Sequence, residues 1–163
     1  MNYKKILLNF TIVLLIFFSD RFSKMYILKL AELDEKVDIY LAPFLNLYLI
    51  WNKGIAFGLF SLNDESVYNF LTIIISIIVI AILIMIIQLR GFQRYSLLMV
   101  FGGSLGNLYD RIYFSAVPDF IDFHIGSFHW FIFNVADIFI TIGVICLIYA
   151  EIFLNKDENE KFN

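Results

Sequence analysis

The amino-acid sequence predicts an all-α integral membrane protein built as one unit, and three observations lead to this fold class. First, 61% of the 163 residues are hydrophobic, and the mean hydropathy is +0.81. Second, the apolar residues form long blocks instead of the spaced pattern that a soluble amphipathic element shows. Third, the block from Leu71 to Ile87 contains no charge. With its flanks it reaches the roughly 20 residues that a spanning helix needs.

Four transmembrane helices can be placed along the chain, and with their loops they form one predicted domain over residues 1–155. A polar cytoplasmic tail is expected at 156–163. The third helix has the weakest signal, because it contains three glycines and several polar residues. The predicted spans cover about 6–28, 67–89, 95–113 and 130–154.

The first predicted helix resembles a cleavable signal peptide, since Lys4 and Lys5 precede an apolar core. No small-residue cleavage site follows that core, so we interpret the segment as a membrane anchor. Basic residues lie before the first helix, between the second and third, and after the fourth, whereas the segment between the first two helices is mainly acidic. The positive-inside rule therefore places both termini in the cytoplasm and the two larger loops outside.

A β-hairpin is predicted between the first two helices, in the stretch "FLNLYLIWNKGIAFGLF". Alternating aromatic and branched residues predict strands over about 44–51 and 55–60, and "WNKG" with Gly54 is a turn signal. At the membrane surface such a hairpin could hold an extended peptide by strand pairing. A plain surface hairpin is the alternative interpretation.

Polar residues of the predicted helices fall at one depth near the outer face. Asp20 and Lys24 are four residues apart and can pair on one side of the first helix. Asn134 and Asp137 lie in the first turns of the fourth helix. Ionisable residues inside a membrane usually face the bundle interior and mark function, although a purely structural cluster is the alternative. Further residues expected at this depth come from the third helix and the loop after it: Gly103, Gly106, Asn107, Asp110, Asp119 and Asp122.

Carboxylates are the reactive groups that this layer offers in number. Two carboxyl groups held close together cannot both ionise easily, so one keeps a proton at neutral pH. The ionised partner can take a proton from an attacking water, and the protonated one can polarise the carbonyl and then protonate the leaving amine. The layer therefore predicts aspartic-protease chemistry, without selecting which of its acidic residues form the pair.

The sequence predicts neither a metal site nor a cofactor. His124 and His129 are the only histidines, and we interpret both as ordinary interfacial residues. Cys146 is the single cysteine, so an intramolecular disulfide is excluded. The chain has no Gly-rich phosphate loop and no basic stripe, so no nucleic-acid partner is expected.

Five motifs, taken together, resemble one known family. They are "SDRFSK" at 19–24, "WNKGIAFG" at 51–58, "GGSLGNLYDR" at 102–111, "VPDFIDF" at 117–123 and "FNVAD" at 133–137. In this order and topology the chain closely resembles the lipoprotein signal peptidases, the type II signal peptidases of bacteria. The resemblance runs from the first predicted helix through the fourth. Each motif alone is weak, but their combination is highly specific.

The resemblance implies an activity, a location and a fold. It implies an aspartic endopeptidase of the bacterial cytoplasmic (inner) membrane that needs no cofactor. Such an enzyme cleaves diacylglyceryl-modified prolipoproteins just before the lipidated cysteine. The implied partners are these substrates, membrane lipids and the cyclic-peptide inhibitor globomycin. The implied fold has four transmembrane helices, an extracytoplasmic β-cradle over about 30–66 and a short helical lid in or near 60–69 or 29–38.

The resemblance also assigns site residues by their motif positions. The family's catalytic aspartates match Asp119 and Asp137, a choice that spacing alone could not make. Arg111 matches an arginine that can bond peptide carbonyls, and Gly54 matches a turn glycine. The amides that line the family's site match Asn52, Asn107 and Asn134. Supporting polar positions match Asp20, Lys24 and Asp110. Phe131 stands where the family often has proline, which leaves the start of the fourth helix open.

Two other functions stay open on the sequence alone. A proton or ion conduit also uses buried carboxylates, but it needs polar residues through the full membrane depth, and the inner halves of the predicted helices offer few. A non-catalytic relative of the peptidases would bind lipidated peptide without cleaving it.

Overall fold

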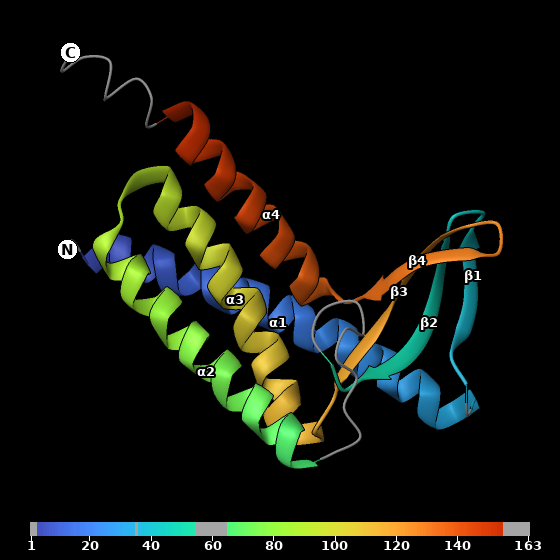
Figure 1. The fold of residues 1–163 in the computed structure, drawn as a ribbon. Helices are drawn as coiled ribbons and strands as arrows, with labels where there is room; N and C mark the ends of the chain where they lie inside the picture. The colour runs from blue at the N-terminus through green and yellow to red at the C-terminus, as the bar shows by residue number, and fades with distance from the viewer. Residues whose placement is uncertain (1–2, 35, 55–64, 155–163) are drawn as a thin grey trace.

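The computed structural model describes residues 3–34, 36–54 and 65–154. Long helices run beside one another, and a small sheet projects from one end of them (Figure 1). The described elements, in chain order, are α1 (Tyr3–Asp34), β1 (Asp38–Ala42), β2 (Leu45–Asn52), α2 (Glu65–Gln88), α3 (Gly91–Phe114), β3 (Val117–Ile125), β4 (Phe128–Phe133), α4 (Val135–Tyr149) and the π-helical turn η2 (Ala150–Leu154).

Three of the described helices are long and apolar enough to cross a membrane: Tyr3–Leu33, Glu65–Gln88 and Val135–Leu154. Ile73, Ile77 and Ile80 of α2 are each more than half exposed in the isolated chain. An apolar surface of this kind is typical of a helix that faces lipid, and the protein is accordingly an integral membrane protein. The remaining long helix, α3, is too polar to count as a membrane span by composition alone. The prediction of four spans therefore stays a prediction.

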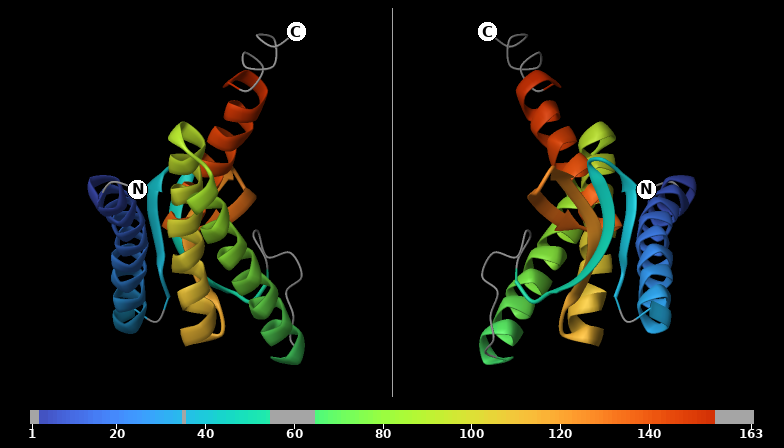
Figure 2. Two further views of the ribbon diagram at one scale, coloured as in Figure 1. Left: turned by 90° about the vertical axis from the view of Figure 1, so that its left-hand side faces the viewer. Right: turned by 90° about the vertical axis from the view of Figure 1, so that its right-hand side faces the viewer.

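α3 is the central helix. It lies between α1 and α2 in both views of Figure 2, and it also packs against α4. Two glycines of this helix explain the close approach. A Cβ atom on Gly103 would lie 2.5 Å from the backbone oxygen of Ala136 in α4, and one on Gly106 would lie 2.6 Å from Asp20 Oδ2 in α1. Glycine at these two positions therefore lets three helices meet at one level.

The sheet is antiparallel and has the strand order β1-β2-β3-β4 in the described residues. The predicted first strand, 44–51, corresponds to β2, but its partners are β1 and β3. The predicted second strand, 55–60, lies outside the described residues. Half of the sheet comes from β3 and β4, where the sequence predicted a loop followed, from about residue 130, by the start of the fourth helix. A core of Ile27, Val37 and Phe120 joins this sheet to α1.

Two helix boundaries differ from the expected spans. α1 continues to Asp34, so the region expected for the cradle begins as helix. α4 begins at Val135 and not near residue 130, because residues 128–133 pair with β3 as strand β4. Of the two segments proposed for the lid, 29–34 completes α1 and 65–69 begins α2, while 60–64 lies outside the described residues.

A buried cluster of charges joins α1 to α3. Lys24 Nζ lies 2.9 Å from Asp20 Oδ2 and 2.7 Å from Asp110 Oδ2, and Arg21 Nη1 lies 2.6 Å from Asp110 Oδ1. Lys24, Asp20 and Asp110 have no solvent exposure. Two cations and two anions balance one another, which makes their burial tolerable. The pairing of Asp20 with Lys24 expected from the sequence is confirmed.

We predict that Gly103→Ala destabilises the protein by about 1–3 kcal/mol, because the new methyl group collides with backbone and not with a movable side chain. Thermal unfolding of the detergent-purified protein measures the effect. Ile112→Ala is the matched control, since Ile112 lies on the same helix and is 69% exposed. Equal thermal midpoints for the two variants would contradict the close packing.

We predict that Lys24→Met destabilises the protein by about 3–5 kcal/mol, because two buried carboxylates are left with one cation. Lys29→Met, at an exposed position on the same helix, should have little effect. The double variant Lys24→Met/Asp110→Asn restores charge balance and should recover part of the loss. Chemical or thermal unfolding in detergent tests all three. A double variant less stable than Lys24→Met would rule out charge imbalance as the cause.

Candidate active site

Asp119 is held by two asparagine side chains that arrive from different elements. It lies on β3 opposite Ile50 of β2 and is 2% exposed. Asn52, the last residue of β2, donates from Nδ2 to Asp119 Oδ2 at 2.9 Å. Asn134, the N-cap residue of α4, donates from Nδ2 to Asp119 Oδ1 at 2.6 Å. Both carboxylate oxygens are therefore fixed by amide donors.

Backbone groups orient the two amides. The backbone N–H of Gly54 donates to Asn52 Oδ1 at 2.8 Å, and that of Asp137 donates to Asn134 Oδ1 at 3.1 Å. Since an amide oxygen can only accept, each of these bonds turns the opposite NH₂ group toward Asp119. The local chain conformation at the end of β2 and at the start of α4 thus sets the position of this carboxylate.

Asp137 belongs to a capping box at the start of α4. Its Oδ2 accepts from the backbone N–H of Asn134 at 3.1 Å, while the Asn134 side chain accepts from the Asp137 N–H. This reciprocal pair satisfies backbone donors that a helix start leaves open. The second oxygen, Oδ1, accepts from Asn107 Nδ2 at 2.8 Å. The three-residue spacing in "FNVAD" therefore begins the helix and places its carboxylate.

The buried charge cluster reaches Asp137 through Asn107. Lys24 Nζ donates to Asn107 Oδ1 at 3.0 Å, which directs the Asn107 NH₂ group toward Asp137. In addition, Asp20 Oδ1 accepts from the backbone N–H of Ala136 at 3.0 Å. An anion there is favourable because the N-terminus of a helix carries partial positive charge. Lys24 and Asp20 thus contact Asn107 and the start of α4, while Asp110 bonds Lys24. The supporting role that their motif positions imply stays a prediction.

Both aspartates line one cavity of about 180 Å³. Burial, together with the nearby charge of Asp137, raises the pKa of Asp119 to about 6, although the hydrogen bonds from Asn52 and Asn134 act in the opposite direction. The residues that line the cavity are Asn52, Ile75, Ser104, Asn107, Arg111, Val117, Asp119, Asn134, Asp137 and Ile140.

Arg111 closes one side of this cavity. Its Nη2 donates to the backbone oxygen of Gly54 at 2.6 Å, and its own backbone oxygen accepts from the Tyr68 hydroxyl at 3.3 Å. Its second terminal nitrogen, Nη1, is buried and has no hydrogen-bond partner among the described residues. Arg111 therefore offers a donor to a further carbonyl oxygen.

The structure brings the expected residues together, with differences in detail. The three asparagines, Arg111 and both motif aspartates line the cavity, whereas Gly54 contacts two of them from outside. Asp122, which the residues alone could not separate from Asp119, bonds His129 instead. Arg21 was missed: it lies in "SDRFSK", but its bond to Asp110 depends on how α1 and α3 are rotated. Ser104, which directly follows Gly103, was also missed.

An apolar groove of about 390 Å³ adjoins the cavity and shares two residues with it, Asp137 and Ile140. Its other lining residues are Phe131, Ile132, Phe133, Ile138, Thr141 and Ile142. It opens along β4 and the first turns of α4, on a face where Ile138 and Ile142 are exposed. A carboxylate at the end of an apolar groove can act on a molecule that is itself partly apolar.

Comparison with known proteins places the chain in a family. The family model described as "Signal peptidase (SPase) II" matches residues 12–153. The lipoprotein signal peptidase of Pelagibacter ubique is 58% identical over 161 residues, which is 98% of this chain and 97% of the relative. The lipoprotein signal peptidase of Anaplasma phagocytophilum is 43% identical over 135 residues, covering 82% and 84% of the two chains.

Solved structures agree with the sequence comparison. Two chains described as bacterial membrane enzymes studied by the in meso method superpose with TM-scores of 0.70 and 0.71, at 31% and 32% identity. The first comparison covers 94% of this chain and 90% of the other, and the second covers 89% and 92%. The matched family model, the nearly full-length relatives and the shared fold together show that this chain belongs to the lipoprotein signal peptidase family, signal peptidase II.

Proposed function

We propose that this protein is an aspartic endopeptidase that cleaves diacylglyceryl-modified prolipoproteins just before the lipidated cysteine. Membership of the lipoprotein signal peptidase family supports the removal of signal peptides from prolipoproteins, and with it a hydrolase. The observation that carries the finer proposal is the meeting of Asp119 and Asp137 at one cavity, each fixed by asparagine donors.

In the proposed mechanism the two aspartates share one proton. The ionised carboxylate takes a proton from a water molecule as its oxygen attacks the scissile carbonyl, and the protonated partner donates its proton to the carbonyl oxygen. The product is a tetrahedral diol. Its collapse breaks the C–N bond. The carboxyl group that received the water's proton passes it to the leaving amine, and the other carboxylate takes a proton back from a diol hydroxyl group. The cycle returns one proton to the pair and needs no metal or cofactor.

The substrate is proposed to lie across the sheet and the groove. Its peptide runs extended beside the sheet, where Asn52 ends β2 and Arg111 presents an unpaired N–H group to a peptide carbonyl. Its acyl chains lie along the apolar groove between β4 and α4. Because the lipid anchors the substrate in the membrane surface, the search for the scissile bond is confined to one layer. Globomycin is expected, by family resemblance, to compete for this cavity.

The orientation in the membrane is part of the proposal. α1 begins and η2 ends at the end of the helices away from the sheet (Figure 1). Lys5, Arg90 and Arg94 line a cavity at that end, where the positive-inside rule expects cytoplasm. We therefore propose a multi-pass protein of the bacterial inner membrane, with both termini cytoplasmic and the sheet and aspartates at the outer face. The polar tail, 156–163, lies outside the described residues.

We predict that Asp119→Asn and Asp137→Asn each lower kcat by at least about 10³-fold, because an amide can neither accept the water's proton nor donate one to the carbonyl oxygen. The assay is cleavage of a lipidated prolipoprotein, followed by mass spectrometry. Asp38→Asn is the matched control, since the Asp38 carboxylate is exposed and its ion pair with Lys36 is long, at 3.9 Å. A variant that accumulates in membranes and cleaves at the wild-type rate would refute the pair.

We predict that kcat/KM falls as pH rises through a midpoint near 6. The pKa of Asp119, about 6, lies above its ordinary value of 3.8, so the pair keeps its shared proton past the usual range and loses it at higher pH. Asp137→Asn removes a neighbouring negative charge and should lower the pKa of Asp119, as measured by infrared titration of the protonated carboxyl group. An activity midpoint at about 4, the value of an unperturbed aspartate, would contradict this assignment.

A further inference from the structure

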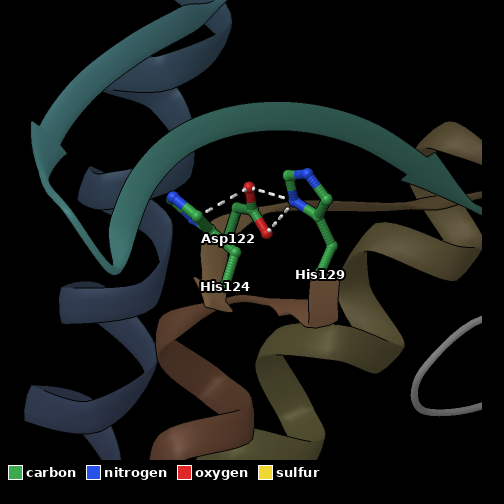
Figure 3. Close-up of side chains that lie close together, drawn as sticks. All are labelled: Asp122, His124 and His129. Carbon is green, nitrogen blue, oxygen red and sulfur yellow. Dashed lines mark hydrogen bonds and ion pairs between the residues drawn. The ribbon is translucent and has the colours of Figure 1, made fainter. Parts of the chain in front are cut away.

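A second group of titratable side chains lies on the β3–β4 hairpin, outside the cavity of the two aspartates. Asp122 and His124 are two residues apart on β3, so they point to the same side of the strand. His129 of β4 is the register partner of His124. Figure 3 shows the three side chains turned toward one another, with Asp122 between the two rings.

The distances within this group are those of ligands gathered around one point. His129 Nδ1 lies 2.8 and 3.0 Å from the two oxygens of Asp122, and His124 Nδ1 lies 3.6 Å from Asp122 Oδ2. The two imidazole rings are 5.2 Å apart and inclined by 31°. One ligand atom from each residue can be chosen so that all three lie within 4.8 Å of one another.

The hydrogen bonding of the group is incomplete. Asp122 is 1% exposed and His124 is 7% exposed, and His124 Nδ1 has no hydrogen-bond partner among the described residues. A buried polar nitrogen without a partner is unfavourable and rare in native proteins. The Asp122–His129 bond alone leaves this nitrogen unsatisfied, whereas a cation placed between the three side chains would bond all of them.

We propose that Asp122, His124 and His129 bind a divalent transition-metal ion, with Zn²⁺ as the ion that best fits two imidazole nitrogens and one carboxylate oxygen. Zn²⁺ takes such ligands at about 2.0–2.2 Å in a tetrahedral arrangement. The His129 side chain is 54% exposed, so it can rotate to close the remaining separation. Its exposed side also leaves the fourth position to water.

The ion would act as a clip between β3 and β4. Asp122 follows Asp119 by three residues, and His129 precedes Asn134 by five. Joining the two strands here would fix the segments that deliver Asp119 and the start of α4, without touching the peptide bond that is cleaved. The metal therefore has a structural role, and its presence does not depend on the proposed aspartate chemistry.

The test uses the full-length protein in detergent, purified with a tag that contains no histidine and freed of metal by a chelator. We expect calorimetric titration with Zn²⁺ to show one ion per chain, and His124→Ala, His129→Ala and Asp122→Asn each to weaken binding by at least about tenfold. Cys146→Ser removes the single thiol and should leave binding unchanged, as should Asp119→Asn, which tests separation from the aspartate pair.

A measurement on the unaltered chain guards against misfolded variants. Because the protein has two histidines, their ring-proton NMR signals report this group alone. We expect one equivalent of paramagnetic Co²⁺ to broaden or shift both sets of signals, and excess Zn²⁺ to reverse the effect. Histidine signals that do not change with Co²⁺ would overturn the proposal. It would also be overturned if Zn²⁺ binding were lost in Cys146→Ser but kept in the variant that lacks both histidines.

Discussion

The bonds of Lys24 are the interaction on which the rest of the structure depends. Its ammonium group lies without solvent contact and bonds Asp20, Asp110 and Asn107. The first two bonds balance the charges that join α1 to α3. The third fixes an amide that in turn holds Asp137. A charge network that would be expensive in lipid on its own thus also positions the Asp137 carboxylate on a different helix.

The candidate site exists only where the sheet meets the helices. Asp119 comes from β3 and Asp137 from α4, and Asn134 is the residue that bonds both: its side chain donates to Asp119 and its backbone N–H donates to Asp137. The apolar contact of Phe120 with Ile27 holds β3 against α1. Neither layer alone would place the two carboxylates at a common cavity, so the geometry of the site depends on the packing of the sheet against the helices.

Local patterns predicted much of the fold and the site, but not the contacts that depend on three-dimensional register. Uninterrupted apolar blocks predicted the helices. Motif positions predicted part of the cavity lining, namely Asn52, Asn107, Arg111, Asp119, Asn134 and Asp137, but not Ser104 or the apolar residues. The β3–β4 hairpin was missed although signals for it were present. Ile125 and Phe128 flank a two-residue Gly-Ser turn, and Gly126 has a φ of +60°, as the first position of a tight hairpin turn prefers. The grouping of Asp122 with both histidines follows from that hairpin. Because the hairpin was not predicted, the grouping was not predicted either.

The capping box of α4 makes the arrangement of Asp119 and Asp137 sensitive to local opening of one helix end. Helix ends open more readily than helix centres, and local opening takes far less free energy than global unfolding. Here the end in question carries Asp137 and the amide that steadies Asp119. Fraying of a single turn would therefore separate the two acidic groups while the surrounding helices stay assembled. The proposed chemistry would then be lost through a few bonds at one helix start, before the whole bundle melts.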